Sequence, residues 1–237
     1  MRQKDTLNSD YIVHLEALKK ISDAITSDQY LEDVLKLIVT LTAQVMKSKI
    51  CSLMLLDKTK NELVLKATQS ISEIYNKKPN LKLGKGIAGT VAKNAQPLQV
   101  YDVQKDKKYL HREIAKKESL KSLLSVPLIV RKEIIGVLNC YTSEPHTFSR
   151  TEINMITTVA NQASIVIENS RILVESQVIR EELETRKLLE RAKSILIKEL
   201  NLSENEAFRK IQQYSMNTRK SIREVAESIL TANAMKH

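Results

Sequence analysis

Cationic and amide side chains gather near the C-terminal end of the sequence, in and just before the stretch from Ser203 to Leu230. These residue types suit contacts with a nucleic acid, because cations bind phosphates and amides can read the edges of bases. The candidate phosphate contacts are Arg191, Lys193, Arg209, Arg219 and Lys220, and the candidate base contacts are Gln212, Gln213 and Asn217. RNA loops would suit such a surface, since their unstacked bases expose their edges. A solvated polar face without a partner is the plainer interpretation.

Two short helices are expected to position these side chains. Ser203-x-x-Glu206 and Ser221-x-x-Glu224 each have the form of a capping box, in which the serine hydroxyl and the glutamate carboxylate accept hydrogen bonds from opposite N–H groups of the first turn. Residues 217–220 lie between the two helices and are predicted to form an exposed, positively charged elbow. Apolar residues at helical spacing predict a small core shared with the end of a preceding helix.

That preceding helix is predicted to be long. Ser149-x-x-Glu152 has the form of a third capping box, and no signal for a helix end follows before Asn201. A seven-residue repeat joins Ile153, Ala160, Ile167, Val174, Glu181, Leu188 and Ile195. This spacing is typical of a coiled coil. The helix is therefore expected to pack on a first domain and to continue as a two-stranded coiled coil, with a bent or interrupted helix between Glu175 and Arg186 as the alternative.

An α+β domain is predicted before the long helix. Strands are predicted at residues 49–57, 62–68, 123–130 and 133–142, the last two as a hairpin around Arg131 and Lys132. An amphipathic helical segment at residues 10–25 and a helix capped by Asp28 should precede the strands.

The segment GKGIAG carries the glycines Gly84, Gly86 and Gly89 and should form a loop that opens a short helix. Such loops can bind phosphate. This one does not match the phosphate-binding pattern G-x-x-x-x-G-K-[ST], nor the complete dinucleotide-binding pattern with its downstream acid. The three glycines are therefore expected to allow a tight turn and close packing of the helix on the sheet.

Recognisable catalytic and metal-binding motifs are missing from the sequence. The histidines, His14, His111, His146 and His237, are scattered, without the close spacing of a zinc site. No G-x-S-x-G nucleophile motif occurs. We therefore predict that the protein is not an enzyme, that it has no metal site, and that no cofactor can be identified.

Charge and cysteine content limit the partners and the compartment. The formal net charge of +10 favours acidic partners such as nucleic acid. Cys51 and Cys140 lie in apolar, strand-like runs without a C-x-x-C spacing, which favours free thiols in a reduced, cytoplasmic protein. No apolar run approaches the roughly 18 residues of a membrane span, so no membrane partner is expected.

Residues 27–171 resemble a GAF domain. The matching segments are GIAGTVAKNAQPLQVYDV, SLLSVPLIVRKEIIGVLNCY and FSRTEINMITTVANQASIVIENSRI, in the expected order. The resemblance implies a GAF-like antiparallel sheet flanked by helices, and a pocket that in many members binds a small regulatory ligand. No residues match a bilin-attachment cysteine, a cyclic-nucleotide motif or a redox cysteine pair.

Residues 188–237 resemble an ANTAR domain. The matching pairs are Ala192-Lys193, Ala207-Phe208, Ser215-Met216 and Val225-Ala226. The resemblance implies a three-helix bundle that binds RNA hairpins, commonly as a dimer, and prevents a transcription terminator from forming. Ser194 replaces a family glycine, and Gln212 replaces an arginine common before the Ser-Met pair.

Together these observations predict an N-terminal helix at residues 1–26, a GAF-like sensor domain at 27–171, a helical linker or coiled coil at 172–187, and an ANTAR-like domain at 188–237. The expected function is that of a signal-regulated transcription antiterminator, a homodimer that binds stem-loops in an mRNA leader. A small molecule in the GAF pocket is the candidate effector. The alternatives are a DNA-binding regulator and a dimeric GAF protein-interaction module that does not bind nucleic acid. Against DNA binding, the usual helix-turn-helix turn contains glycine, which this elbow lacks.

Overall fold

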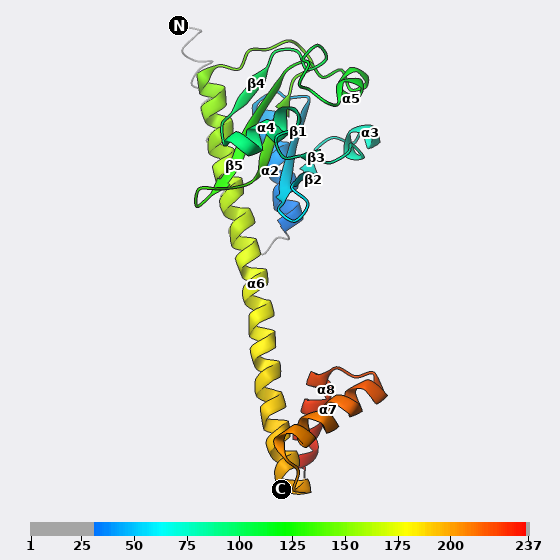
Figure 1. Cartoon of the computed structure of the whole chain (residues 1–237). Helices are drawn as coiled ribbons and strands as arrows, with labels where there is room; N and C mark the ends of the chain where they lie inside the picture. The colour runs from blue at the N-terminus through cyan, green and yellow to red at the C-terminus, as the bar shows by residue number, and fades with distance from the viewer. Residues whose placement is uncertain (1–30, 236–237) are drawn as a thin grey trace. The chain divides into compact units, whose positions relative to one another are not determined.

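The computed structural model of the protein describes residues 31–235. Contacts within the chain divide it into two compact units, one ending at Ser170 and the other beginning at Arg171 (Figure 1). The predicted helix at residues 1–26 and the predicted cap at Asp28 lie outside the described residues.

The first unit is built on a six-stranded antiparallel sheet with the strand order β3-β2-β1-β6-β5-β4. The strands are β1 (Ile50–Asp57), β2 (Glu62–Thr68), β3 (Leu81–Lys82), β4 (Leu98–Val100), β5 (Leu123–Val130) and β6 (Glu133–Tyr141). The predicted hairpin of β5 and β6 is confirmed. Arg131 and Lys132 at its tip have φ angles of 49° and 70°, as the tight two-residue hairpin turns require.

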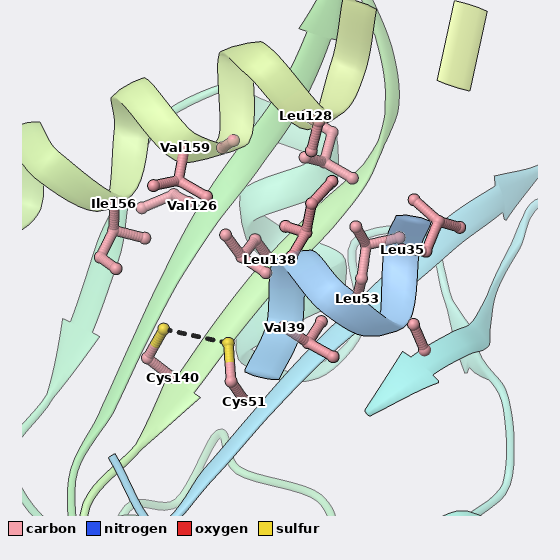
Figure 2. Packing of buried hydrophobic residues seen from close by; sticks show 14 of the residues in the cluster. Leu35, Val39, Cys51, Leu53, Val126, Leu128, Leu138, Cys140, Ile156 and Val159 are labelled. Atoms are coloured by element: carbon pink, nitrogen blue, oxygen red, sulfur yellow. Dashed lines mark hydrogen bonds between the residues drawn. The ribbon is translucent and has the colours of Figure 1, made fainter. Parts of the chain in front are cut away.

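One face of the sheet is covered by α2 (Leu31–Val45) and by the first part of α6 (Arg150–Leu200). Figure 2 shows side chains of both helices, such as Leu35 and Ile156, meeting strand residues such as Leu138. Side chains alternate between the faces of a strand, so every second residue of β1, β5 and β6 enters this core. The core is wholly aliphatic apart from Phe148 and the sulfur-containing residues.

The other face carries three shorter helices, α3 (Glu73–Asn76), α4 (Gly86–Asn94) and α5 (Arg112–Lys117). Two buried clusters lie beneath them, one rich in tyrosine and the other aliphatic. Gly84 and Gly86 have positive φ angles of 77° and 64°, and a Cβ atom at Gly89 would lie 2.5 Å from the carbonyl oxygen of Lys82. The predicted structural role of this glycine segment is confirmed.

Helix α6 runs without interruption for 51 residues, so the alternative of an interrupted helix between Glu175 and Arg186 is wrong. Ile153, Ala160 and Ile167 of the predicted heptad repeat pack in the core of the first unit. Leu188 packs in the core of the second unit. Both ends of the repeat therefore serve cores within the chain, whereas Val174 and Glu181 in its middle are exposed. The coiled coil at residues 172–187 stays a prediction.

The second unit is a three-helix bundle, as predicted. The end of α6 packs with α7 (Glu204–Thr218) and α8 (Ile222–Ala234) around the buried residues Ala192, Ile211, Val225 and Ala226. Both predicted capping boxes are present. The Ser203 N–H donates to Oε2 of Glu206 over 2.8 Å, and the Ser221 N–H donates to Oε2 of Glu224 over 2.7 Å. The third capping box starts α6, where the Ser149 N–H donates to Glu152 over 2.7 Å.

Candidate nucleic-acid interface

The outward face of α7 presents three of the predicted contact residues. Arg209, Gln212 and Gln213 are exposed and lie three and four residues apart, so their side chains share one face of the helix. Ala207 and Ile211, at 0% and 1% exposure, mark the opposite, buried face. The structure thus brings one cation and two amides together on a surface that faces away from the bundle core.

A second row runs beside the first along α7. Lys210, Gln213, Tyr214 and Asn217 are exposed and separated by three or four residues, and Gln213 belongs to both rows. Tyr214 is 54% exposed, and its place in the interface was not predicted from the sequence. Its position four residues after Lys210 could have indicated this place, because residues at that spacing share one face of a helix. An exposed aromatic ring among cations can stack on an unpaired base.

The elbow between α7 and α8 is shorter than predicted. Helix α7 continues to Thr218, so Asn217 and Thr218 are helical and only Arg219 and Lys220 connect it to Ser221. Arg219 adopts the left-handed conformation with φ 56° and ψ 25°. The Ser215 hydroxyl donates a 2.6 Å hydrogen bond to the carbonyl oxygen of Lys220. This bond fixes the backbone of the elbow while both cationic side chains stay exposed.

Lys193 differs from the other predicted phosphate contacts because its side chain is only 9% exposed. Its amine lies 2.8 Å from Glu190 and 2.8 Å from Glu204. These hydrogen bonds raise the pKa of the Lys193 amine above its ordinary value. Arg191 is exposed on α6 and lies about 200° around the helix from Lys193, at about 100° per residue. It therefore does not share the side of α6 that faces α7.

Several other cations of the second unit are free of ion pairs. Arg223 pairs with Glu227 at 2.9 Å and lies 3.9 Å from Glu184, so its charge is largely compensated. Among the described residues, no ion pair involves Arg191, Arg209, Lys210, Arg219 or Lys220. These exposed cations place positive charge on α7 and on the elbow, and Arg191 adds a charge on α6.

The first unit contains a small void of about 10 Å³ beneath the start of α4 and the loop before α5. Its lining includes Lys78, Tyr109, His111 and Tyr141. The Lys78 amine lies 3.9 Å from the centre of the Tyr75 ring, and burial lowers its pKa to about 7. Burial, and secondarily the charge of Lys78, lower the pKa of His111. The Lys78 and His111 side chains can offer hydrogen-bond donors to the void, which has room for about one water molecule.

Unpaired polar atoms surround this part of the interior. Nε2 of His111 is buried without a hydrogen-bond partner among the described residues, as are the Ser125 hydroxyl and both amide atoms of Asn139. Ser125 and Asn139 are directly paired across β5 and β6. Their neighbours along each strand point into the core beneath α2 and α6. Because successive side chains of a strand point to opposite faces, Ser125 and Asn139 point to the other face, which carries the void. Buried polar groups without partners are rare and call for a bound molecule or water.

The two cysteines make no reactive site. Cys51 and Cys140 face each other across β1 and β6 with their sulfur atoms 3.5 Å apart (Figure 2), and both are completely buried. Burial raises the pKa of the Cys51 thiol well above its ordinary value, which disfavours the reactive thiolate. No cluster of potential metal ligands occurs in residues 31–235. No helix in that range is long and apolar enough to cross a membrane.

Comparison with known families assigns both units. The chain belongs to the GAF domain family, whose profile matches residues 28–168, and it carries an ANTAR domain matched over residues 177–230. The architecture is therefore a GAF domain followed by an ANTAR domain, as the resemblance implied. GAF domains are sensory and regulatory and ANTAR domains bind RNA, so the protein has the composition of a regulator.

Curated relatives share the first domain. The chain is 27% identical over 158 residues to a protein of Escherichia coli (strain K12) named "Phosphoenolpyruvate-dependent phosphotransferase system", an alignment that covers 67% of this chain. It is 30% identical over 155 residues to the "Methyl sulfide methyltransferase-associated sensor" of Methanosarcina acetivorans, covering 63% of this chain. These alignments span only 21% and 16% of the relatives' own lengths.

Solved structures agree with the fold of the first unit. The GAF domain of a phosphoenolpyruvate-protein phosphotransferase from Coxiella burnetii matches with a TM-score of 0.63 and 28% identity, covering 69% of this chain and 98% of that one. A free methionine-R-sulfoxide reductase from Neisseria meningitidis matches with a TM-score of 0.59 at 20% identity, covering 68% of this chain and 91% of that one. The second likeness concerns the fold alone.

Proposed function

We propose that the protein is a signal-regulated transcription antiterminator, which binds stem-loops in an mRNA leader as a homodimer and thereby prevents a terminator from forming. The observation that carries this proposal is the double row of exposed cations and amides on α7, continued by the elbow, in an ANTAR domain. Residues 172–187 act as the linker and residues 188–237 as the RNA-binding module. Nascent mRNA as the target places the protein in the cytoplasm.

The contact residues divide into two roles. Arg191, Arg209, Arg219 and Lys220 are exposed cations that neutralise phosphates, and each adds to the salt dependence of binding. Gln212, Gln213 and Asn217 offer amide donors and acceptors to the edges of unpaired bases, and Tyr214 offers a stacking surface. Lys193 leaves the predicted set, since its two carboxylate partners hold it between α6 and α7; we assign it a structural role.

Binding of the full-length protein to a tandem-hairpin RNA, compared with duplex DNA of similar length between about 50 and 200 mM salt, tests the proposal. Preference for the RNA that persists at the higher salt is expected.

The double variant Arg219→Ala, Lys220→Ala should bind the RNA more weakly, whereas Lys107→Ala, Lys108→Ala removes the same charge from the first unit and should not. Unchanged RNA affinity in the elbow variant would refute its assignment. Preference for duplex DNA would indicate a DNA-binding regulator, and no nucleic-acid binding would indicate a protein-interaction module.

The sensor function is assigned to the void beneath α4. An anionic small molecule suits it best, because Lys78, His111 and the N-terminus of α4, which has no side-chain cap, all offer positive charge or hydrogen-bond donors. The void must widen to admit such a ligand. Inorganic phosphate and succinate serve as probes in thermal unfolding, where either should raise the melting temperature of the wild type more than that of Lys78→Met. Equal shifts in both proteins would refute the role of Lys78.

A further inference from the structure

An apolar stripe on the middle of α6 is left exposed by residues 31–235, the part of the chain that the structure describes. Ile172, Ile179 and Leu183 are 40%, 57% and 54% exposed. With Ser176 they lie at alternating intervals of four and three residues, which is the spacing of a coiled-coil seam. The same spacing extends back along the sequence to Asn169 and Ile165. In heptad terms Ile172 and Ile179 occupy d positions, and Ser176 and Leu183 occupy a positions.

The stripe predicted from the sequence, which contains Val174 and Glu181, lies on the opposite side of α6. Its own a and d positions include the polar residues Arg171 and Glu181. Leu188, which continues the stripe of Val174 and Glu181, packs together with Ala192 against α7 and α8 in the bundle core. Leu183 lies nine residues before Ala192, a rotation of about half a turn at about 100° per residue. The stripe of Ile172, Ser176, Ile179 and Leu183 is therefore the one that the bundle leaves uncovered.

Charged residues flank the uncovered stripe in a regular order. Glu175 and Glu182 occupy g positions, and Arg180 and Lys187 occupy the following e positions. In a parallel dimer each g residue meets the e residue of the next heptad on the partner, so Glu175 would meet Arg180 and Glu182 would meet Lys187. In an antiparallel dimer g residues meet g residues, and glutamate would oppose glutamate. Glu175 also accepts a hydrogen bond from Arg171 over 2.8 Å, but an exposed pair of this kind contributes little.

We propose that this stripe is the seam of a parallel, in-register coiled coil with a second copy of this chain. The proposal rests on the homodimer of the proposed function and specifies its residues and orientation. The seam is short, because Arg186 and Glu190 occupy the next d and a positions. So short a coiled coil is marginal by itself, and its association is open to control by the domains at either end.

Disulfide crosslinking of the full-length protein tests the seam and its orientation. Ser176→Cys and Leu183→Cys are each oxidised with oxidised glutathione, and Val174→Cys, on the opposite side of the helix, is the control. Cys51 and Cys140 do not interfere in the folded protein because both are buried. Ser176→Cys and Leu183→Cys should each form covalent dimers several-fold faster than Val174→Cys. Crosslinking at only one of the two seam positions would refute the parallel register, and rates equal to the control would refute the seam.

Charge reversal tests the flanking pairs. Glu175→Lys, Glu182→Lys makes the flanks wholly positive, and Arg180→Glu, Lys187→Glu makes them wholly negative. Each protein alone should crosslink more slowly through Ser176→Cys, and a mixture should form the heterodimer several-fold faster than either forms its homodimer. A mixture with no such preference would overturn the charge assignment. None of these substitutions touches α7 or the elbow, so loss of dimerisation and loss of the RNA-binding surface are distinguished by the hairpin RNA titration.

Discussion

The amine of Lys193 lies 2.8 Å from Oε1 of Glu204, so an ion pair joins the penultimate turn of α6 to the first turn of α7. Glu190 holds the same amine from one turn earlier on α6. The hydrogen bonds from Lys193 lower the pKa of the Glu204 carboxyl, which keeps this partner ionised. The Ala-Lys pair of the ANTAR signature is thus explained by bundle assembly, with Ala192 in the core and Lys193 at the junction of two helices.

Lys193→Met should weaken the bundle and leave the RNA-binding surface intact. The substitution removes both ion pairs while keeping a flexible side chain of similar length. We expect the melting temperature to fall by a few degrees, with an unchanged slope of log affinity against log salt for hairpin RNA. Arg191→Met, two residues away on the exposed side of α6, is the control and should show the converse. A reduced salt slope for Lys193→Met would return this lysine to the set of phosphate contacts.

Arg219→Gly should raise the stability of the protein and weaken its binding of RNA. Arg219 has a φ angle of 56° at the C-terminal cap of α7, and glycine adopts this conformation without the penalty of roughly 1–2 kcal/mol that a residue with a side chain incurs there. The loss of one cation should lower the salt slope of RNA binding by about 0.7–0.9. Urea unfolding and RNA titration measure the two effects.

Asn201→Gly is the matched control for that prediction. Asn201 follows the end of α6 with a φ angle of 50°, so glycine should stabilise the bundle there without any change of charge. Its RNA affinity should stay that of the wild type. If both variants lost affinity equally, rigidity of the bundle rather than the charge of Arg219 would govern binding.

The cysteine pair should be unreactive in the folded protein. Cys51 and Cys140 are completely buried, so a thiol reagent such as DTNB should modify them only at the rate of unfolding, which rises with added urea. Cys140→Ser should lower the free energy of unfolding by about 1–3 kcal/mol, because it buries a hydroxyl in an apolar core. Cys140→Ala is the control for lost volume alone. Rapid modification of the native protein by DTNB would show that the pair is accessible and open to oxidation.

Local signals in the sequence predicted most of the elements correctly. The three capping boxes are read from serine and glutamate three residues apart, and each one forms in the structure. Apolar, strand-like runs marked the four longer strands, and the two-residue turn between the last two marked their hairpin. The four-residue helix α3 and the two-residue strand β3 were not predicted, because they are too short to show a period. Their formation depends on packing against distant parts of the chain, as with Tyr75 of α3, whose hydroxyl lies 2.8 Å from that of Ser52.

The candidate sites were less predictable because they depend on how helices cross. Lys193 and Glu204 are eleven residues apart, and only the packing of α7 on α6 brings them together. The partner of the heptad stripe on α6 could not be predicted, because a repeat of apolar residues does not say whether its partner is another chain or the same one. The void beneath α4 joins Lys78 and His111 from separate loops, and no spacing in the sequence connects those two residues.

Lys78→Met should stabilise the protein at neutral and lower pH. The Lys78 amine has a pKa of about 7 in the folded state against an ordinary value of 10.5. Between these values the unfolded state binds more protons, so the contribution of Lys78 to the free energy of unfolding rises with pH and is least favourable below pH 7. The advantage of the variant should therefore be greatest near neutral pH and below, and it should disappear toward about pH 10.5.

Urea unfolding of wild type and variant at about pH 6.5 and about pH 10 measures the difference, and other titrating groups cancel in the comparison. Lys77→Met is the control, since Lys77 is exposed and pairs only with Glu73 at 2.8 Å among the described residues. It should show no pH-dependent gain. A gain for Lys78→Met that is the same at both pH values would mean that the amine stays charged in the folded state, and that the void does not require a negative partner.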